Sequence, residues 1–363
     1  MKILIISTVP VDKNGITNVI FNYYRAINSS EIDFDFVSIN NPNDNYINEI
    51  EARGGKLFVL KRSSTGLIHY IKQLSKIIKN GKYNAVHIHG NSHTVVFELI
   101  AAKLGGCKNR IVHAHSTSCN SILLHKILTI PFNILCNKRI ACGKMAGFFM
   151  FGRKQFHILN NGIDIEKYSF REDIRLLWRK KLGYRNNDVV LGHVGYFSEV
   201  KNQKYIIEIL NVIVEAHSDY KLLLVGDGIQ RKEIMDQVDR YELGNNVLFT
   251  GNIDNVSDYL NCMDVIVMPS LYEGLPLSLI EQQANGLQCV VSDTITTEVD
   301  KTGNLSWLSI KDSPSFWANK ILSLNSHNKR EERSIKAVKN IIASDFSIQN
   351  EAKKLQDFYF SIK

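Results

Sequence analysis

Two glutamates, Glu273 and Glu281, lie eight residues apart within the segment CMDVIVMPSLYEGLPLSLIEQQANGLQCVVSD, residues 262–293. An apolar run that ends at Pro269 predicts a buried parallel strand. Apolar residues at helical spacing follow Pro276, and proline suits the first position of a helix. We therefore expect Glu273 in a loop at the carboxyl end of a strand and Glu281 in the helix that follows.

This arrangement suits an anionic diphosphate. Gly274 lets a ligand approach the backbone closely, and the N–H groups of Leu275, Leu277 and their neighbours, on either side of Pro276 at the start of the helix, have no helical partner. If the eight residues were all helical, the two carboxylates would be about 12 Å apart along the axis, one on each side of a diphosphate. The alternative is two unrelated, solvated acids, because charged residues are mostly exposed.

The string PSLYEGLPLSLIEQQANGLQCVVSD resembles the signature of the retaining, nucleotide-sugar-dependent glycosyltransferases called group 1 or family 4. That signature has a Pro-Ser, a Glu-Gly and a second Glu eight positions after the first, in a helix that ends at a Gly. Gln282 and Gln283 stand where the family commonly has small residues. The resemblance implies that Glu273 contacts sugar hydroxyls beside the anomeric carbon and that Glu281 holds the nucleotide ribose.

Two further strings resemble family loops that approach the donor diphosphate. In VDKNGITNVI the matching positions are Gly15 and Ile16, and Asn14 replaces a common glycine. Because Asn tolerates a left-handed backbone, the turn is still feasible. In GHVGYFSEVKN the family usually has a basic residue directly after the second Gly and a Lys five positions later.

Within GHVGYFSEVKN, Gly195 and Lys201 fit that pattern, but Tyr196 replaces the first basic residue. A phenol donates one hydrogen bond and brings no charge, so the diphosphate loses one ion pair. The string VLFTGNI, which leads to Asn252, fits the family loop that contacts the base through its backbone. VGDGIQR lacks the third glycine of a dinucleotide turn, so no NAD site is expected.

Four histidines follow strand-like runs in two alternating pairs, His87 with His89 and His113 with His115. Alternation sends both members of a pair to one face of a strand, and the carboxyl ends of strands border ligand crevices. The family resemblance places His115 at the sugar-transfer site. A histidine-rich metal site is the alternative, although no carboxylate or Cys completes a recognisable ligand set.

Strand-like and helical runs alternate along all 363 residues, which predicts parallel sheets covered on both faces. The expected strands are Lys2–Val9, Ile32–Ile39, Lys56–Leu60, Ala85–His89, Arg110–His115, Arg139–Cys142, His157–Asn160, Val189–Val194, Lys221–Val225, Val247–Thr250, Val265–Met268 and Cys289–Val291. Asp33 and Asp35 share a face of the second strand, where a solvated pair is favoured over a metal site. The alternation of strand-like and helical runs is interrupted near residues 161–164, where we expect the hinge between the two domains.

The resemblance extends along the whole chain and implies the GT-B fold, an α/β architecture of two doubly wound, Rossmann-like domains facing across a cleft. The expected division is an acceptor-binding domain at residues 1–165, a nucleotide-sugar-binding domain at 166–344, and a C-terminal helix at 345–363 that returns to the first domain. The length suits two domains, each with its own core.

Charge is unevenly distributed. Residues 1–165 carry 20 Lys and Arg against 9 Asp and Glu, a net of +11, and the remainder carries 24 against 27, a net of −3. A basic half attracts nucleic acid, anionic lipid or a phosphorylated substrate, but no nucleic-acid-binding motif is present. The stretch Ser121–Lys154 is both apolar and basic. Core helices explain most of it, and a surface that docks on anionic lipid is the alternative.

Six cysteines without a CxxC pair indicate neither a disulfide framework nor a zinc site and favour a reducing cytosol. The opening MKILIISTVP lacks a cleavage site and predicts a first strand rather than a signal peptide. The sequence contains no uninterrupted run of about 18 apolar residues, the length that a membrane-spanning helix needs. We expect a cytoplasmic protein that is peripheral, if membrane-bound at all, on the inner face of the plasma membrane.

Together these features predict a retaining, metal-independent glycosyltransferase of bacterial capsule, exopolysaccharide or O-antigen synthesis, with no cofactor. It would move a hexose or N-acetylhexosamine, UDP-linked, from a nucleotide diphospho-sugar to a saccharide or a polyprenyl-pyrophosphate-linked saccharide. Front-face transfer and a covalent intermediate both remain open. The alternatives are a catalytically idle nucleotide-sugar-binding partner subunit and another GT-B enzyme such as a nucleotide-sugar epimerase, against which the Glu273–Glu281 spacing speaks.

Overall fold

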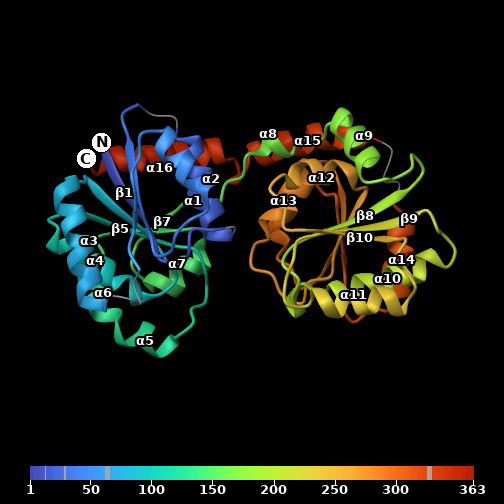
Figure 1. Ribbon diagram of the computed structural model, residues 1–363, viewed down its shortest axis with the longest axis horizontal. Coiled ribbons are helices and arrows are strands. Elements are labelled where there is room, and N and C mark those ends of the chain that lie inside the picture. The colour runs from blue at the N-terminus through green and yellow to red at the C-terminus, as the bar shows by residue number, and fades with distance from the viewer. Residues whose placement is uncertain (13, 28–29, 62–65, 325–328) are drawn as a thin grey trace. The chain divides into compact units, whose positions relative to one another are not determined.

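The computed structural model describes residues 1–12, 14–27, 30–61, 66–324 and 329–363, which form two compact units (Figure 1). The first unit comprises Met1–Gly162 and Ile348–Lys363, and the second comprises Ile163–Ser347. The chain thus crosses between units three residues before the boundary expected at 165 and three after the one expected at 344. Each unit contains one parallel sheet with helices on both faces, which confirms the predicted α/β class.

The first unit has seven strands in the order β3-β2-β1-β4-β5-β6-β7. They are β1 (Lys2–Ser7), β2 (Asp33–Ser38), β3 (Leu57–Val59), β4 (Ala85–His89), β5 (Asn109–Ala114), β6 (Lys138–Ala141) and β7 (His157–Ile158). Its helices are α1 (Gly15–Ala26), α2 (Asp44–Ala52), α3 (Leu67–Gly81), η1 (His93–Val95), α4 (Val96–Leu104), α5 (Ile122–Ile127), α6 (Thr129–Leu135), α7 (Lys144–Phe151) and α16 (Ile348–Ser361).

The second unit has six strands in the order β10-β9-β8-β11-β12-β13. They are β8 (Val189–Val194), β9 (Tyr220–Val225), β10 (Val247–Gly251), β11 (Val265–Met268), β12 (Gln288–Ser292) and β13 (Leu305–Leu308). Its helices are α8 (Ile165–Tyr168), α9 (Glu172–Lys181), η2 (Glu199–Lys201), α10 (Gln203–Val214), α11 (Arg231–Arg240), α12 (Val256–Cys262), α13 (Leu277–Ala284), η3 (Thr297–Val299), α14 (Pro314–Leu322) and α15 (Arg330–Ile342).

The central strands are mostly apolar because helices bury both of their faces, and the buried exceptions include the histidines of β4, β5 and β8. In the second unit one core packs beneath α10, α11 and α14, and the other beneath α12, α13 and α15 (Figure 1). In the first unit α3, α4 and α6 cover one face with Leu74, Leu99 and Phe132. The rings of Phe21 on α1 and Phe36 on β2 stack 5.6 Å apart on the other face.

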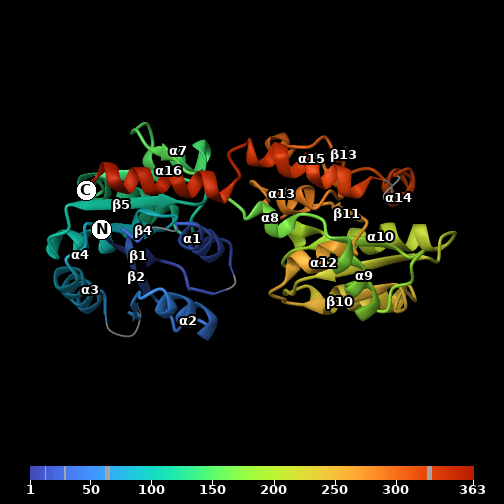
Figure 2. The same cartoon turned by 90° about the horizontal axis from the view of Figure 1, so that it is seen from above.

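The C-terminal helix α16 belongs to the first unit and lies beside α1, which confirms the predicted return of the chain (Figure 2). Its Tyr359 is fully buried. The Glu351 carboxylate accepts a hydrogen bond from Asn160 N at 2.7 Å, and Asn109 Nδ2 donates to Ile362 O at 2.7 Å. The last helix is therefore a structural part of the first sheet's cover.

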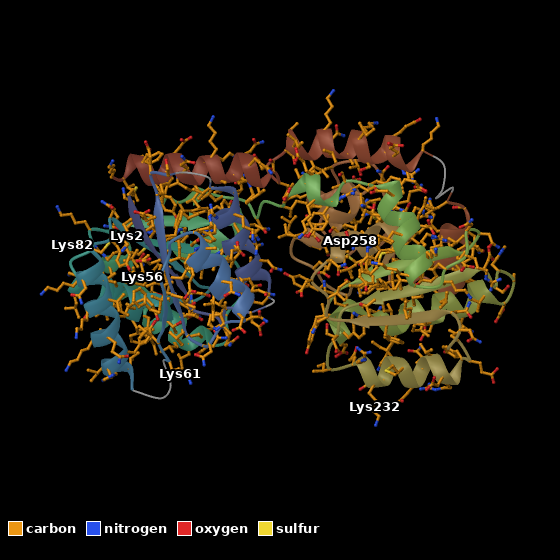
Figure 3. All side chains as sticks on the ribbon, turned by 45° about the horizontal axis from the view of Figure 1, so that its top comes forward. Lys2, Lys56, Lys61, Lys82, Lys232 and Asp258 are labelled. Atoms are coloured by element: carbon orange, nitrogen blue, oxygen red, sulfur yellow. The ribbon has the colours of Figure 1, made fainter. Side chains whose placement is uncertain are left out.

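Two expectations need correction. The short β13 was not predicted, because its four residues give too little pattern. Asp35 is not solvated: it is 3% exposed and accepts from Tyr83 Oη at 2.7 Å and Lys56 N at 2.8 Å, while Lys2 Nζ lies 2.9 Å away. Lys2 and Lys56 are among the basic side chains of this unit (Figure 3). With its oxygens bonded to these groups, Asp35 is a structural acid.

Candidate functional site

The strand order of the second unit reverses between β8 and β11. From β8 the chain moves outward through β9 and β10, then returns to the other side of β8 with β11. Loops that leave the carboxyl ends of such neighbouring strands diverge, and ligands of open α/β sheets bind at this point. The loop after β8 carries Lys201, and the loop after β11 carries Glu273. The topology therefore brings together two residues 72 positions apart.

Lys201 and Glu273 form an ion pair at this reversal point. Lys201 Nζ lies 2.5 Å from Glu273 Oε1, and Ser270 Oγ donates to the same oxygen at 2.9 Å. The side chains are 21% and 12% exposed. A further hydrogen bond from Leu271 N to Val200 O, 2.8 Å, ties the two loops together. Both charges are thus held, partly desolvated, at the edge of the sheet.

Gly195 and Tyr196 precede this pair on the loop after β8. Gly195 N donates to Val225 O at 3.0 Å, and a Cβ at Gly195 would lie 3.6 Å from Lys201 Cε, so the lysine stem lies over the glycine. Tyr196 is 58% exposed, and its backbone oxygen accepts from Gln203 Nε2 at 3.1 Å. The main chain at Tyr196 is anchored while its phenol faces solvent.

Residues 274–276 lead from Glu273 into α13. Pro276 was expected to be the first helical residue but is the N-cap, so the helix begins one position later, at Leu277; Leu279 N donates to the Pro276 oxygen at 3.0 Å. A Cβ added at Gly274 would meet no atom within 4 Å. The backbone N–H groups of Gly274 and Leu275 have no partner among the described residues. Because 273–276 are not helical, the separation expected from helical rise does not apply.

Glu281 lies on the middle of α13 and is half-buried rather than solvated. Burial raises the pKa of its carboxyl to about 7, although a hydrogen bond with the Tyr168 side chain and the charge of Lys167 oppose the shift. Tyr168 and Lys167 come from α8, which packs on α13. Neither residue could be predicted from the sequence, because nothing in their own segment indicates contact with a helix more than a hundred residues later.

Asn252 is exposed in the loop after β10, and β9 separates that strand from β8. It therefore lies along the same edge of the sheet, two strands away from the loop that carries Lys201. The intervening VGDGIQR turn has a structural role. Gly226 has φ +129°, and a Cβ there would lie 2.1 Å from Gly195 O, so only glycine lets this turn support the Gly195 loop.

In the first unit the strand order reverses between β1 and β4, and Gly15 and Ile16 begin α1 after β1. Asn14 is extended, with φ −139°, and its side chain accepts from Thr17 N at 3.0 Å. The left-handed backbone considered for Asn14 is therefore wrong, and the residue acts as an N-cap. The N–H groups of Gly15 and Ile16 have no partner in the described part of the chain, from which Lys13 is absent.

The four histidines gather on one face of β4 and β5. Ring centroids are 4.3 Å apart for His87 and His89 and 4.2 Å for His113 and His115, so the predicted same-face pairs are confirmed. His89 Nδ1 lies 2.8 Å from His115 Nε2. Burial lowers the pKa of His115 to about 4 and that of His87 to about 3, so these rings are neutral at pH 7.

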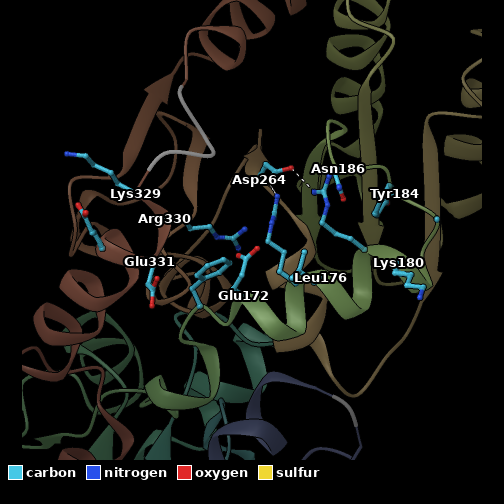
Figure 4. A pocket seen from close by; sticks show the side chains of 14 residues that line it. Glu172, Leu176, Lys180, Tyr184, Asn186, Asp264, Lys329, Arg330 and Glu331 are labelled. Carbon is cyan, nitrogen blue, oxygen red and sulfur yellow. Dashed lines mark hydrogen bonds and ion pairs between the residues drawn. The ribbon is translucent and has the colours of Figure 1, made fainter.

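A cavity of about 1040 Å³ lies elsewhere in the second unit, lined by residues of α9, the start of α15 and Asp264 (Figure 4). Asp264 precedes β11, so the cavity is at the opposite end of the strands from Glu273. Its buried arginines are already bonded: Arg175 and Arg179 lie 2.5 and 3.1 Å from the Asp264 carboxylate, and Arg330 bonds main-chain oxygens, including Asn261 O at 3.3 Å. These contacts mark a structural network.

An apolar patch covers α5, α6 and part of α7 in the first unit. Its members are at least 40% exposed: Ile122, Leu123, Leu124, Ile127, Ile130, Ile134, Met145 and Phe148. The same stretch of sequence carries exposed basic residues, namely Lys126 on α5, Lys144 at the start of α7, and Arg153 and Lys154 just after it. The other apolar residues of this stretch, including Phe132, Met150 and Phe151, lie in the core as expected, so core packing accounts for them but not for the exposed set. None of the helices in the described part of the chain is long and apolar enough to span a bilayer.

Comparison with known proteins identifies the family and the fold. Residues 175–341 match the family Glycosyl transferases group 1, and residues 12–129 match Glycosyl transferase 4-like. The glycosyltransferase-family protein EpsF of Bacillus subtilis is 32% identical over 329 residues, which cover 86% of this chain and 84% of EpsF.

An Escherichia coli UDP-Gal:alpha-D-GlcNAc-diphosphoundecaprenol alpha-1,3-galactosyltransferase is 30% identical over 321 residues, 80% of this chain and 78% of that protein. The structure of Anabaena HepE in complex with UDP superposes with a TM-score of 0.77 at 16% identity, covering 99% of this chain and all of HepE, and so shares its fold. The expected GT-B fold is confirmed, and the chain belongs to the group 1 glycosyltransferases.

Proposed function

We propose that this glycosyltransferase moves a hexose or N-acetylhexosamine, with retention of configuration and without a metal ion, from a UDP-linked sugar. The acceptor is a saccharide or a polyprenyl-pyrophosphate-linked saccharide of a bacterial surface polysaccharide. The observation that carries the proposal is the ion pair between Lys201 and Glu273, 2.5 Å long, at the strand reversal of the second unit. Through this pair, Lys201 supplies a cation for the diphosphate, and Glu273, next to it, supplies a carboxylate for the sugar.

In this proposal the donor diphosphate takes over Lys201 from Glu273. The released carboxylate then accepts hydrogen bonds from sugar hydroxyls beside the anomeric carbon. The N–H groups of Gly274 and Leu275, ahead of the Pro276 cap, bind phosphate oxygens, because they have no protein partner and sit at the positive end of α13. These groups stabilise the charge that develops on the leaving diphosphate, the task that a divalent ion performs in other enzymes.

The other proposed contacts with the donor are inferred from where each residue lies in the second unit. Gly195 lets the diphosphate approach the backbone, and the exposed phenol of Tyr196 offers one neutral donor. Glu281, on the same helix as the proposed phosphate site, accepts hydrogen bonds from the ribose. The loop at Asn252 borders the base through its main chain.

The first unit carries the remaining candidate residues. Gly15 and Ile16 offer two N–H groups at the start of α1, a further site for an anion. His115, whose Nε2 is bonded to His89, orients the transferred sugar with a neutral imidazole.

The relatives support the substrate classes. The Escherichia coli relative is named for a UDP-linked galactose donor and a diphosphoundecaprenol-linked acceptor, and HepE has been solved with UDP and with UDP-glucose. A capsular polysaccharide biosynthesis glycosyltransferase, CapH of Staphylococcus aureus, is 25% identical over 321 residues. A UDP-sugar donor and a lipid-linked saccharide acceptor are the combination we propose here.

A lipid-linked acceptor requires access to a membrane, and the apolar patch on α5, α6 and α7 provides it. Eight exposed apolar side chains and four exposed basic ones in the same stretch of sequence suit the surface of an anionic bilayer. We assign peripheral attachment on the cytoplasmic face of the membrane to this surface.

A catalytically idle partner subunit is the second candidate, and Tyr196 favours it, because the site lacks one cation. A thermal-shift screen of nucleotide sugars, followed by measurement of nucleoside diphosphate release with and without acceptor, distinguishes the two. A donor at 100 times its dissociation constant stabilises the protein by about 2.7 kcal/mol. The transferase predicts stabilisation and acceptor-dependent release. Binding without release by the pure protein would identify the idle subunit, and no binding of any nucleotide sugar would contradict both.

A further inference from the structure

The histidines of β4 and β5 form a cluster more compact than sugar transfer requires. His87 and His89 lie on β4, and His113 lies opposite His89 on β5 in the strand register. One ring nitrogen of each can be chosen so that all three lie within 4.8 Å of one another. The three residues are at most 3% exposed.

Several of these nitrogens lack a well-formed hydrogen bond. Both ring nitrogens of His113 and Nε2 of His87 are buried and make no hydrogen bond of ordinary geometry among the described residues, although the main chain at Leu159 interacts with the His113 ring. Leaving a buried polar atom unpaired costs about 1–3 kcal/mol, so three such atoms in one cluster need an explanation. A shared ligand that accepts nitrogen lone pairs would provide one.

The hydrogen bonds that do exist leave the rings set up for such a ligand. His87 Nδ1 lies 2.6 Å from Tyr359 Oη, and His89 Nδ1 lies 2.8 Å from His115 Nε2. Both bonds use Nδ1 and leave Nε2 of His87 and His89 for another partner. A histidine that binds a metal through one nitrogen is usually held through the other in this way.

Space for a further small ligand lies beside the cluster. A cavity of about 20 Å³ is bordered by His87, His89, Tyr23 and Tyr359. This is about the volume that one water molecule needs. Three imidazoles and one water make a four-coordinate set, the number that Zn²⁺ prefers.

We propose that His87, His89 and His113 bind one first-row transition-metal ion, Zn²⁺ being the ion whose ligand preference they match best. Neutral imidazole nitrogens are ordinary ligands of such an ion. The ion joins β4 to β5 and, through the hydrogen bond between His87 and Tyr359, fixes α16 to the sheet. Its role is structural, so the proposed sugar transfer does not depend on it.

The test is titration of the full, chelator-treated chain with ZnCl₂ by calorimetry and with CoCl₂ by visible absorption. We expect one ion per chain, Co²⁺ bands typical of tetrahedral nitrogen ligands, and a Zn²⁺-dependent rise in Tm of about 5 °C or more. His113→Gln should abolish the stoichiometric site. His69→Gln, at an exposed position on α3, controls for adventitious binding by surface histidines and should leave it unchanged.

The wild-type measurements decide the matter even if His113→Gln does not fold. Absence of a stoichiometric site, or Co²⁺ without tetrahedral bands, overturns the proposal. So does a folded His113→Gln protein, checked by circular dichroism, that still binds one ion, because the ion is then held elsewhere. Loss of the site in both His113→Gln and His69→Gln would likewise identify surface binding.

Discussion

Lys201 Nζ and Glu273 Oε1 are 2.5 Å apart, although one follows β8 and the other follows β11. In the absence of ligand each side chain neutralises the other in a half-buried position, so neither charge is left unpaired. A diphosphate competes with Glu273 for the lysine. The pair is therefore the resting state of the site that we propose for the donor.

This relationship predicts opposite effects of two substitutions on the binding of free UDP. Lys201→Ala removes a charge-assisted hydrogen bond and should weaken binding by roughly 1.5–3 kcal/mol. Glu273→Gln frees the lysine from its competitor, so UDP should bind as tightly as before or more tightly, while sugar transfer falls at least about 100-fold. Calorimetry and a nucleotide-release assay measure the two effects.

The control for the loss of a lysine is Lys204→Ala, because Lys204 pairs with Glu233 on the exposed surface of α10 and α11. Its UDP affinity should equal that of the wild type. A Glu273→Gln variant that loses UDP binding as severely as Lys201→Ala would show that the carboxylate binds the nucleotide rather than competing with it.

Tyr196→Arg should tighten UDP binding and make it more sensitive to salt. The position is 58% exposed and directly follows Gly195, so an added guanidinium can reach a bound diphosphate. Tyr272→Arg, at another exposed tyrosine of the same region, is the matched control for a gain of charge. An affinity for UDP that does not change with ionic strength in Tyr196→Arg would place residue 196 away from the phosphates.

Glu281→Gln should stabilise the ligand-free protein at high pH. The folded-state pKa of Glu281 is about 7 against an ordinary value of 4.5, so the folded chain holds this proton more tightly and its free energy of unfolding falls as pH rises from 4.5 to 7. Gln carries no such proton. Denaturant unfolding should show a gain that grows from below about 1 kcal/mol at pH 5 to as much as about 3 kcal/mol at pH 8.

Glu298→Gln, an exposed acid on η3, should show no such pH-dependent gain. If the difference between Glu281→Gln and wild type is the same at pH 5 and pH 8, the carboxyl has an ordinary pKa and is solvated.

The patch on α5, α6 and α7 should bind anionic vesicles. Leu123→Asp and Ile130→Asp, at side chains 72% and 74% exposed, should reduce co-sedimentation with phosphatidylglycerol vesicles at low salt without unfolding the protein. Each Lys or Arg near such a surface contributes about 1 kcal/mol, so high salt should also release it. Ile68→Asp on α3, 72% exposed, is the control. Equal sedimentation with neutral vesicles would contradict the assignment.

The sequence predicted the central strands well because they are rich in apolar, mostly β-branched residues and are bounded by polar or turn-forming segments. β4, β8 and β11 occupy the predicted residues. β13 was missed because LSWL is short and only half-buried, and a fully apolar run is what marks a buried strand. The same reasoning located Glu273 in its loop and Glu281 on its helix, since both depend on where apolar spacing stops and starts.

The partners of these residues could not be predicted, because they come from distant parts of the chain. No local pattern indicates that Lys201 meets Glu273, that Tyr168 contacts Glu281, or that Tyr359 of the last helix contacts His87. The burial of Asp35 could not be predicted from its own segment either. Its alternation with Asp33 indicates an exposed face, but Lys2 and Tyr83 bury it in a bonded site.

The central claim, that the carboxyl edge of the second sheet binds the nucleotide, is tested most directly by calorimetric titration of Glu281→Gln with UDP at pH 8. The hydrogen bonds from the ribose to a carboxylate are charge-assisted, and weakening them should cost roughly 1.5–3 kcal/mol, or about ten- to a hundredfold in Kd. Because the variant should be more stable than the wild type, unfolding would not explain the loss. UDP binding as tight as that of the wild type would contradict the account.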